Sequence, residues 1–194
     1  MSKVQIANNA LAYVGVSASI VDFDKDDSAA GLAVRGFYNQ TLKSSLSSFE
    51  WGFCQAYSNP AKIMDMPAGH KWRYAFQYPN DCLVVRDVLS NSESEPHETG
   101  FIDDARVIYC DGSEITVYYT KYVEDITLYP AYFQELLALN LAFKLTVPLS
   151  KSAKMHSSLH GMAAEQLDLA KKTDVKESKQ KVTFKDSAYI DARK

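Results

Sequence analysis

Two histidines are the residues best spaced for metal chemistry. His156 and His160 stand four residues apart, a spacing that places two imidazoles on one face of an α-helix. The zinc-protease pattern also needs a glutamate directly after the first histidine, and Ser157 holds that position. A third ligand would have to come from His97 or Glu165. Because an apolar residue precedes each histidine, the pattern favours residues that flank a buried stripe over a metal site.

Carboxylates and serines are the other side chains that could carry catalysis. The serines around position 47 lie in a predicted helix and lack the glycine-flanked strand-to-helix turn of a nucleophilic serine. A catalytic carboxylate pair is defined by its separation across a cleft, and loop carboxylates are ordinarily solvated. The candidates are Glu93, Glu95, Glu98, Asp103 and Asp104. The sequence predicts no catalytic residue, no metal site and no bound cofactor. A small metal- or carboxylate-dependent hydrolase is the enzymatic alternative.

An aromatic run marks the middle of the chain. Trp72, Tyr74, Phe76 and Tyr78 alternate with other residues, a period of two that predicts a strand with one aromatic face. Such a face can stack nucleic-acid bases, but base-stacking platforms are interleaved with several Lys and Arg residues. Only Lys71 and one arginine lie close by, so the pattern favours packing in a core or an interface.

Helical spacing dominates the N-terminal part. The segment 3–14 carries apolar residues at helical intervals, and Gly15 follows it at a C-cap position. A loop follows and ends in the segment 24–28, which is rich in residues that favour the N-cap and the first turn of a second helix. That helix is predicted to run for about 20 residues to Phe49. Both helices are amphipathic, so each needs a packing partner.

The C-terminal part returns to helical spacing. The segment 131–147 is apolar on most sides, which predicts a helix buried on more than one face, and Pro148 ends it. Ser150 or Ser152 can cap the next helix, whose apolar stripe continues to about Lys172.

Strands are predicted between the two helical parts. The dipeptide Asp111-Gly112 predicts a hairpin with a type I′ turn between the last two strands. The polar, acidic stretch 90–100 is predicted to be an exposed loop. The predicted strands are 72–78, 82–85, 105–110 and 115–122.

The order of these elements defines the predicted fold class. It is α+β with segregated elements: a four-helix bundle formed by the N- and C-terminal helix pairs, an inserted antiparallel β block and an extended C-terminal tail. The predicted domains are 1–50 with 129–173 for the bundle, 51–128 for the β domain and 174–194 for the tail.

Charge is unevenly distributed along the chain. The net charge is −3, yet the segment 171–194 carries eight basic and four acidic residues, so the preceding body is strongly acidic. An acidic body argues against a nucleic-acid-binding face. A basic tail suits docking onto an acidic partner or between copies, although composition alone favours a solvated, disordered tail. Three widely spaced cysteines and an N-terminus without a signal-peptide pattern predict buried free thiols in a protein made in the reducing cytosol.

An ordered series of short motifs runs over nearly the whole chain. The motifs are ALAYVG at 10–15, Trp51, YPNDCLVV at 78–85, YYTKYVED at 118–125, YPAYF at 129–133, the helix 145–174 and YIDARK at 189–194. With these motifs in this order, the sequence resembles the tail tubular protein A family. Members of this family are the head-to-tail adaptor, or gatekeeper-ring, proteins of short-tailed bacteriophages.

The resemblance implies a structural virion protein rather than an enzyme. In this family a ring, expected to be twelvefold, lies beneath the portal protein and joins it to the tail nozzle protein. Double-stranded genomic DNA passes through the lumen without sequence-specific binding, and the strand block faces the next tail component. An acidic body fits such a conduit, because a lumen that attracted phosphates would slow the passage of DNA. The protein would assemble in the host cytoplasm and reside in the neck of the virion.

The resemblance also implies two sets of interface residues. The segment 181–194 would dock onto the portal, and apolar residues spaced among charges suit a segment that folds on binding. The docking residues would be Val182, Phe184, Lys185, Tyr189, Ile190 and Arg193. The ring contacts between helices would involve Tyr38, Leu42, Phe133, Leu137, Met155 and Leu159. The structural alternative is a head-completion or tail-terminator ring protein, which would bind a different ring.

Overall fold

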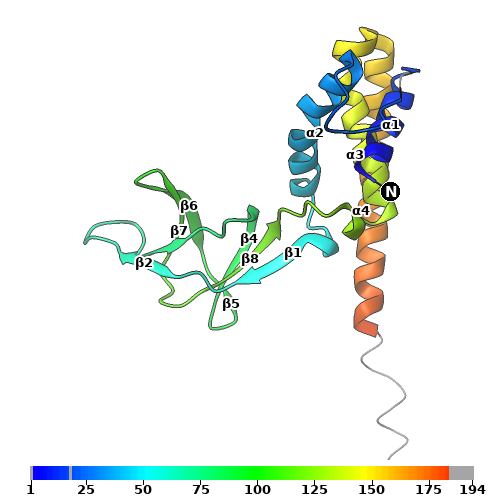
Figure 1. Cartoon of the computed structure of the whole chain (residues 1–194). Coiled ribbons are helices and arrows are strands. Elements are labelled where there is room, and N and C mark those ends of the chain that lie inside the picture. The colour runs from blue at the N-terminus through cyan, green and yellow to red at the C-terminus, as the bar shows by residue number, and fades with distance from the viewer. Residues whose placement is uncertain (1, 18, 184–194) are drawn as a thin grey trace, which may run out of the picture. The chain divides into compact units, whose positions relative to one another are not determined.

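The chain folds into two compact units (Figure 1). The computed structural model describes residues 2–17 and 19–183, with side chains described as far as Ser178. The helical unit comprises Met1–Phe53 and Val123–Lys194, and the β unit comprises Cys54–Tyr122. The predicted α+β class is confirmed, because four helices pack together and the strands form two four-stranded antiparallel sheets.

Local sequence signals mark the ends of the first two helices. α1 (Lys3–Tyr13) is followed by Gly15, whose φ of +76° and backbone hydrogen bonds to the last helical turn form a Schellman motif. α2 (Ala29–Ser47) begins after Ser28, whose hydroxyl accepts the Gly31 N–H at 3.1 Å. The predicted cap at Gly15 is confirmed, and within the segment 24–28 the capping residue is Ser28.

α3 (Ala131–Leu145) is the central helix of the helical unit, because the other three helices pack on it. It is buried on most sides, as its apolar sequence predicts. It runs antiparallel to α2: the Asn140 amide donates to the Ser45 hydroxyl at 2.9 Å, and Trp51, past the end of α2, packs edge-on against Phe133 near the start of α3.

α4 (Ala153–Thr183) follows α3 after a π-helical turn that contains Pro148. It begins after Ser152, whose hydroxyl accepts a backbone N–H of the first turn at 3.3 Å, so this predicted cap is confirmed. α4 runs antiparallel to α3, since Phe143 stacks on His156 at one end and the hydroxyl of Tyr132 bonds to α4 at the other.

α4 is longer than its apolar stripe predicts. The stripe predicts an end near Lys172 and an extended tail from 174 onward, but the helix continues to Thr183. The extended tail is therefore wrong for 174–183. The physical reason is that the segment from Asp174 to Thr183 contains no glycine or proline, and its lysines, glutamate and glutamine are good helix formers.

Two glycines interrupt exposed helix faces. Gly36 in α2 and Gly161 in α4 are both exposed, and a Cβ built on either would meet no described atom within 4 Å. We expect Gly36→Ala and Gly161→Ala each to stabilise the isolated subunit by about 1 kcal/mol, because glycine costs that much in a helix interior. Calorimetry should show Tm rising by about 2–4 °C for each substitution. Gly31→Ala is the matched control, since its Cβ would lie 2.3 Å from the Asp26 carbonyl oxygen, and a fall in Tm is expected there.

Short antiparallel strands form the β unit. They are β1 (Gln55–Ser58), β2 (Lys62–Asp65), β3 (Tyr74–Gln77), β4 (Cys82–Ser90), β5 (Glu93–Ser94), β6 (His97–Ile102), β7 (Ala105–Cys110) and β8 (Thr116–Lys121). One sheet has the order β1-β8-β4-β5 and the other β2-β3-β7-β6. Side chains from both sheets share one apolar core that includes Phe76, Val88, Ile108 and Val117.

The hairpin predicted at Asp111-Gly112 is wrong. β7 and β8 flank this turn, but β7 pairs with β3 and β6 whereas β8 pairs with β1 and β4. The turn therefore carries the chain from one sheet to the other. The Asp111 carboxylate accepts the Arg73 N–H at 2.9 Å. This bond holds the turn beside the start of β3, in the sheet that also contains β7. A dipeptide signal cannot distinguish a hairpin from such a crossing.

Hairpin turns occur instead where no glycine signals them. Asn91 and Ser92 join β4 to β5, Asp103 and Asp104 join β6 to β7, and all four residues have positive φ. Asn and Asp tolerate this left-handed conformation better than most residues do. The stretch 90–100 is largely exposed, as predicted, but it is not a loop, because it contains β5 and the start of β6.

Candidate functional site

The residues predicted to dock onto a portal fall at and beyond the end of α4. Val182 lies in the last turn of α4, and its side chain is outside the described range. The other five, Phe184, Lys185, Tyr189, Ile190 and Arg193, lie outside the described residues. We call residues 174–183 the α4 arm; its first turn, which the structure describes in full, is where the candidate site can be built.

Asp174 anchors the α4 arm in the helical unit. Its side chain is 4% exposed, and it is the one charged residue among the buried side chains that the structure describes. Both carboxylate oxygens accept the Gly52 N–H at 3.1 Å, and Oδ1 also accepts the Tyr132 hydroxyl at 2.7 Å. Burial and the adjacent carboxylate both disfavour the phenolate, so the pKa of Tyr132 lies well above its ordinary value. Asp174 thus belongs to the packed unit, which corrects its assignment to an extended tail.

Gly52 brings the outgoing chain close to α4. It starts the 3₁₀ turn Gly52–Cys54, at the boundary where the chain leaves the helical unit. A Cβ on Gly52 would lie 3.1 Å from the Ser178 hydroxyl and 3.7 Å from an Asp174 oxygen, so the close approach favours glycine here. The preceding Trp51 is fully buried. The exit segment is therefore held on both sides, by the core and by the first turn of the α4 arm.

The returning chain is fixed at the same end of α3. The hydroxyl of Tyr129 donates to the Val123 carbonyl at 2.6 Å, and the Gln134 amide donates to the Tyr129 carbonyl at 2.7 Å. Phe53 on the outgoing segment packs on Phe133 with ring centroids 4.9 Å apart. The segment that leaves the helical unit and the segment that returns to it thus both pack near the start of α3, where Asp174 also makes its contacts.

The residues predicted to make ring contacts lie mostly inside the subunit. Met155 is half-buried, and the other five are buried in the core of the helical unit. These five are Tyr38, Leu42, Phe133, Leu137 and Leu159. A side chain buried in its own subunit has no surface to offer a second copy, so these residues support the helices. Ring contacts would have to come from the exposed faces of the same helices.

The histidine pair packs on an aromatic ring. His156 stacks on Phe143 with centroids 4.3 Å apart, and the His160 ring lies 5.4 Å from the same ring. Among the described residues, no group of three or more His, Cys, Asp or Glu side chains is placed to hold a metal ion. The buried Nδ1 of His156 makes no hydrogen bond and lies beside an open pocket of about 580 Å³ lined partly by Val147 and Lys151. Packing beside a buried stripe accounts for both histidines.

One of the predicted carboxylate candidates, Glu98, has side-chain partners. It accepts the Trp72 indole N–H and the Lys71 ammonium, each at 2.9 Å, and these two contacts hold its pKa below the ordinary value. Asp103 and Asp104 form the β6–β7 turn through their positive φ angles. These three residues therefore have structural roles in the β unit.

The aromatic run and the cysteines belong to cores. Phe76 and Tyr78 are buried in the β-unit core and Tyr74 packs against it, so the prediction of core packing is confirmed for them. Cys54 and Cys110 are buried free thiols, as predicted, whereas the free thiol Cys82 is only half-buried. Burial raises the pKa of Cys110 to about 11, so this thiol stays protonated at neutral pH.

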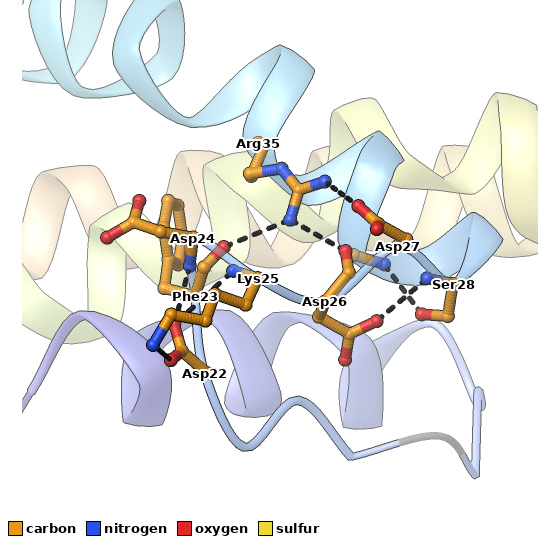
Figure 2. A network of polar contacts seen from close by, with 9 residues as sticks. Asp22, Phe23, Asp24, Lys25, Asp26, Asp27, Ser28 and Arg35 are labelled. Atoms are coloured by element: carbon orange, nitrogen blue, oxygen red, sulfur yellow. Dashed lines mark hydrogen bonds and ion pairs between the residues drawn. The ribbon is translucent and has the colours of Figure 1, made fainter.

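An acidic turn, residues 22–28, precedes α2 (Figure 2). Arg35 on α2 holds it: one guanidinium nitrogen donates to the Asp26 carbonyl at 2.6 Å, and the other pairs with the Asp27 carboxylate at 3.1 Å. The carboxylate of Asp22 accepts two backbone N–H groups within the turn, and the Asp24 N–H together with the Lys25 ammonium holds its pKa below the ordinary value. The turn places a fixed negative charge at the start of α2.

Comparison with known proteins assigns no family: the sequence matches no protein-family model, and no curated protein matches it. Among the described residues, no helix is both long enough and apolar enough to cross a membrane.

Sequence reasoning missed the contact between Asp174 and Gly52. A lone aspartate in a charged segment resembles a solvated residue, and no local pattern pairs it with a glycine more than a hundred residues away. One signal could have found it. Asp174 lies four residues after Ala170 and seven after Leu167, so it continues the buried face of its helix.

Proposed function

We propose that the protein is a ring-forming head-to-tail adaptor of a short-tailed phage, which links the portal to the tail nozzle. The observation that carries the proposal is the ordered series of motifs over nearly the whole chain. The arrangement of elements supports it, since a helical unit built from both ends of the chain and an inserted β unit are what the resemblance implies. The helical unit would form the ring and the β unit would face the next tail component.

Docking to the portal is assigned to the α4 arm and the residues that follow it. The anchor at Asp174 supports this role, because it fixes the base of the arm while Val175, Lys176, Glu177 and Ser178 are exposed. A fixed base lowers the entropy that a docking segment loses on binding. The apolar residues at 182, 184, 189 and 190 would supply most of the contact, and Lys185 and Arg193 the charge pairs.

The acidic body of the chain, to which the β unit contributes, supports a lumen that repels DNA. Residues 54–122 contain ten acidic and six basic side chains, a net charge of −4. An acidic wall would let double-stranded DNA slide past without binding phosphates. A ring reconstruction with a basic lumen would contradict this part of the proposal.

Capture of partners tests the proposal against its structural alternative. The purified chain, immobilised by its N-terminus, should retain a portal ring and should fail to retain a tail-tube ring. The reverse result would favour a head-completion or tail-terminator protein. Retention of neither ring would overturn both assignments.

A further inference from the structure

Two faces of the helical unit are exposed over several helical turns. On α2 the exposed residues follow one line at helical spacing, and we call this line the α2 face: Leu32, Gly36, Asn39 and Lys43. On α4 a second line, the α4 face, consists of Ser157, Gly161, Ala164 and Asp168. Both helices pack on α3 and hardly on each other, so the two faces belong to different sides of the unit.

The two faces run in the same direction. α2 and α4 are each antiparallel to α3, so they are parallel to one another. A rotation about an axis roughly along the helices would bring the α4 face of one copy against the α2 face of the next, with the helices still parallel. Such a head-to-tail contact uses two different surfaces, and repeated contacts close into a ring when the rotation divides a full turn.

The glycines give this contact a register. Gly36 and Gly161 lie at the middle of the two faces with open space around them, and only residues without a side chain let two helix backbones approach closely. With Gly36 of one copy opposite Gly161 of the next, Lys43 meets Asp168, because each lies seven residues further along its helix. Seven residues correspond to about 10 Å of helix rise, so Lys43 and Asp168 lie at the same distance from the paired glycines, each along its own helix.

The same register creates a second charge match at the other end. Lys154 lies seven residues before Gly161, and Ala29 lies seven residues before Gly36. Ala29 directly follows the acidic turn, whose Asp27 side chain is 89% exposed. Lys154 is exposed as well, so it would meet the acidic turn that precedes the neighbouring α2. One register thus pairs opposite charges at both ends.

We propose that the α2 face of one copy docks on the α4 face of a second copy, with Gly36 opposite Gly161. This inference deepens the proposed function, on which it rests for the closure of these contacts into a ring. It replaces the buried residues Tyr38, Leu42 and Leu159 as ring contacts by exposed residues of the same two helices. The partner of the α2 face is therefore the α4 face of a second, identical chain.

Disulfide trapping tests the contact. In the predicted register Asn39 faces Ala164, and both are exposed. At a protein concentration high enough for copies to meet without a portal, the full chain carrying Asn39→Cys and Ala164→Cys, oxidised with copper phenanthroline, should give a ladder of dimers, trimers and larger species. Either single variant should remain monomeric, and an equimolar mixture of the two should stop at the dimer. A control chain with Asn39→Cys and Thr99→Cys, the latter on an exposed strand of the β unit, should form no ladder.

Charge reversal supplies an independent measurement. Lys43→Glu or Asp168→Lys, each added to the trapping chain, should lower the ladder yield by about twofold to fivefold, and the two together should restore it. A trapping chain that stays monomeric, or a single variant that dimerises as readily, would overturn the contact. The outcome is separable from the proposed function. Portal capture by a chain that gives no ladder removes only this interface, and a ladder from a chain that ignores the portal removes only the adaptor role.

Discussion

A chain that lacks Lys181–Lys194 will fold normally and fail to bind the portal. The last described side chains with packing or hydrogen-bonding roles are Asp174 and Ser178, so the deletion begins beyond them. Its free energy of unfolding should therefore change by no more than about 0.5 kcal/mol. The deletion removes all the proposed apolar anchors, and hot-spot residues of that kind each contribute about 2 kcal/mol or more to binding. Affinity for a portal ring should fall by more than about 100-fold.

Two substituted chains separate the apolar from the charged part of the tail. Replacing Phe184, Tyr189 and Ile190 by serine should reproduce nearly the full loss of portal binding. Replacing Lys185 and Arg193 by alanine should lower the affinity for the portal by only about tenfold. The affinity of the parent chain should also fall more steeply with salt concentration than that of this variant. Biolayer interferometry with immobilised portal, alongside a thermal unfolding curve for each chain, gives both numbers. Undiminished portal binding by the truncated chain would refute the docking assignment.

Asp174→Ala will lower the stability of the subunit by about 3 kcal/mol. The substitution removes the charged acceptor of two part-buried donors, the Gly52 N–H and the Tyr132 hydroxyl, and hydrogen bonds to charged groups contribute about 1.5–3 kcal/mol each. For a protein of this size the expected fall in Tm is about 6–12 °C. Asp174→Asn should cost about 2 kcal/mol, because the amide keeps one acceptor oxygen but turns a donor toward a donor.

Matched variants locate the origin of this effect. Glu177→Gln should leave Tm nearly unchanged, because that side chain is exposed and its contact with the Tyr132 hydroxyl is long, at 3.5 Å. Tyr132→Phe should cost about 1 kcal/mol, and the double variant with Asp174→Ala should lose less than the sum of the two. Amide hydrogen exchange at Gly52 should accelerate in the Asp174 variants. An Asp174→Ala chain with an unchanged Tm would show that the buried contact does not exist in solution.

The helices were predictable because their signals are local. Gly15, Ser28 and Ser152 act within one helical turn, and the apolar period identified the faces that meet α3. The same period could not say whether Tyr38 or Leu42 faces its own core or a neighbouring copy, because both require the same spacing. The sequence therefore identified core residues and mistook them for ring contacts.

The sheets and the base of the candidate site depend on contacts that are distant in sequence. Asp111-Gly112 has the composition of a hairpin turn, yet the two strands beside it belong to different sheets. The real turns at Asn91-Ser92 and Asp103-Asp104 use residues that tolerate positive φ without the glycine that would have signalled them. The acceptor at Asp174 and its donor at Gly52 lie 122 residues apart in the sequence.

A mass measurement of the chain mixed with a portal ring tests the central claim most directly. At low concentration the free chain should have its monomer mass of 21.7 kDa, because the portal is expected to template the ring. Added to the portal, it should produce one heavier species whose mass exceeds that of the portal by about twelve times 21.7 kDa. A portal mass that stays unchanged at saturating amounts of the chain would contradict the adaptor function.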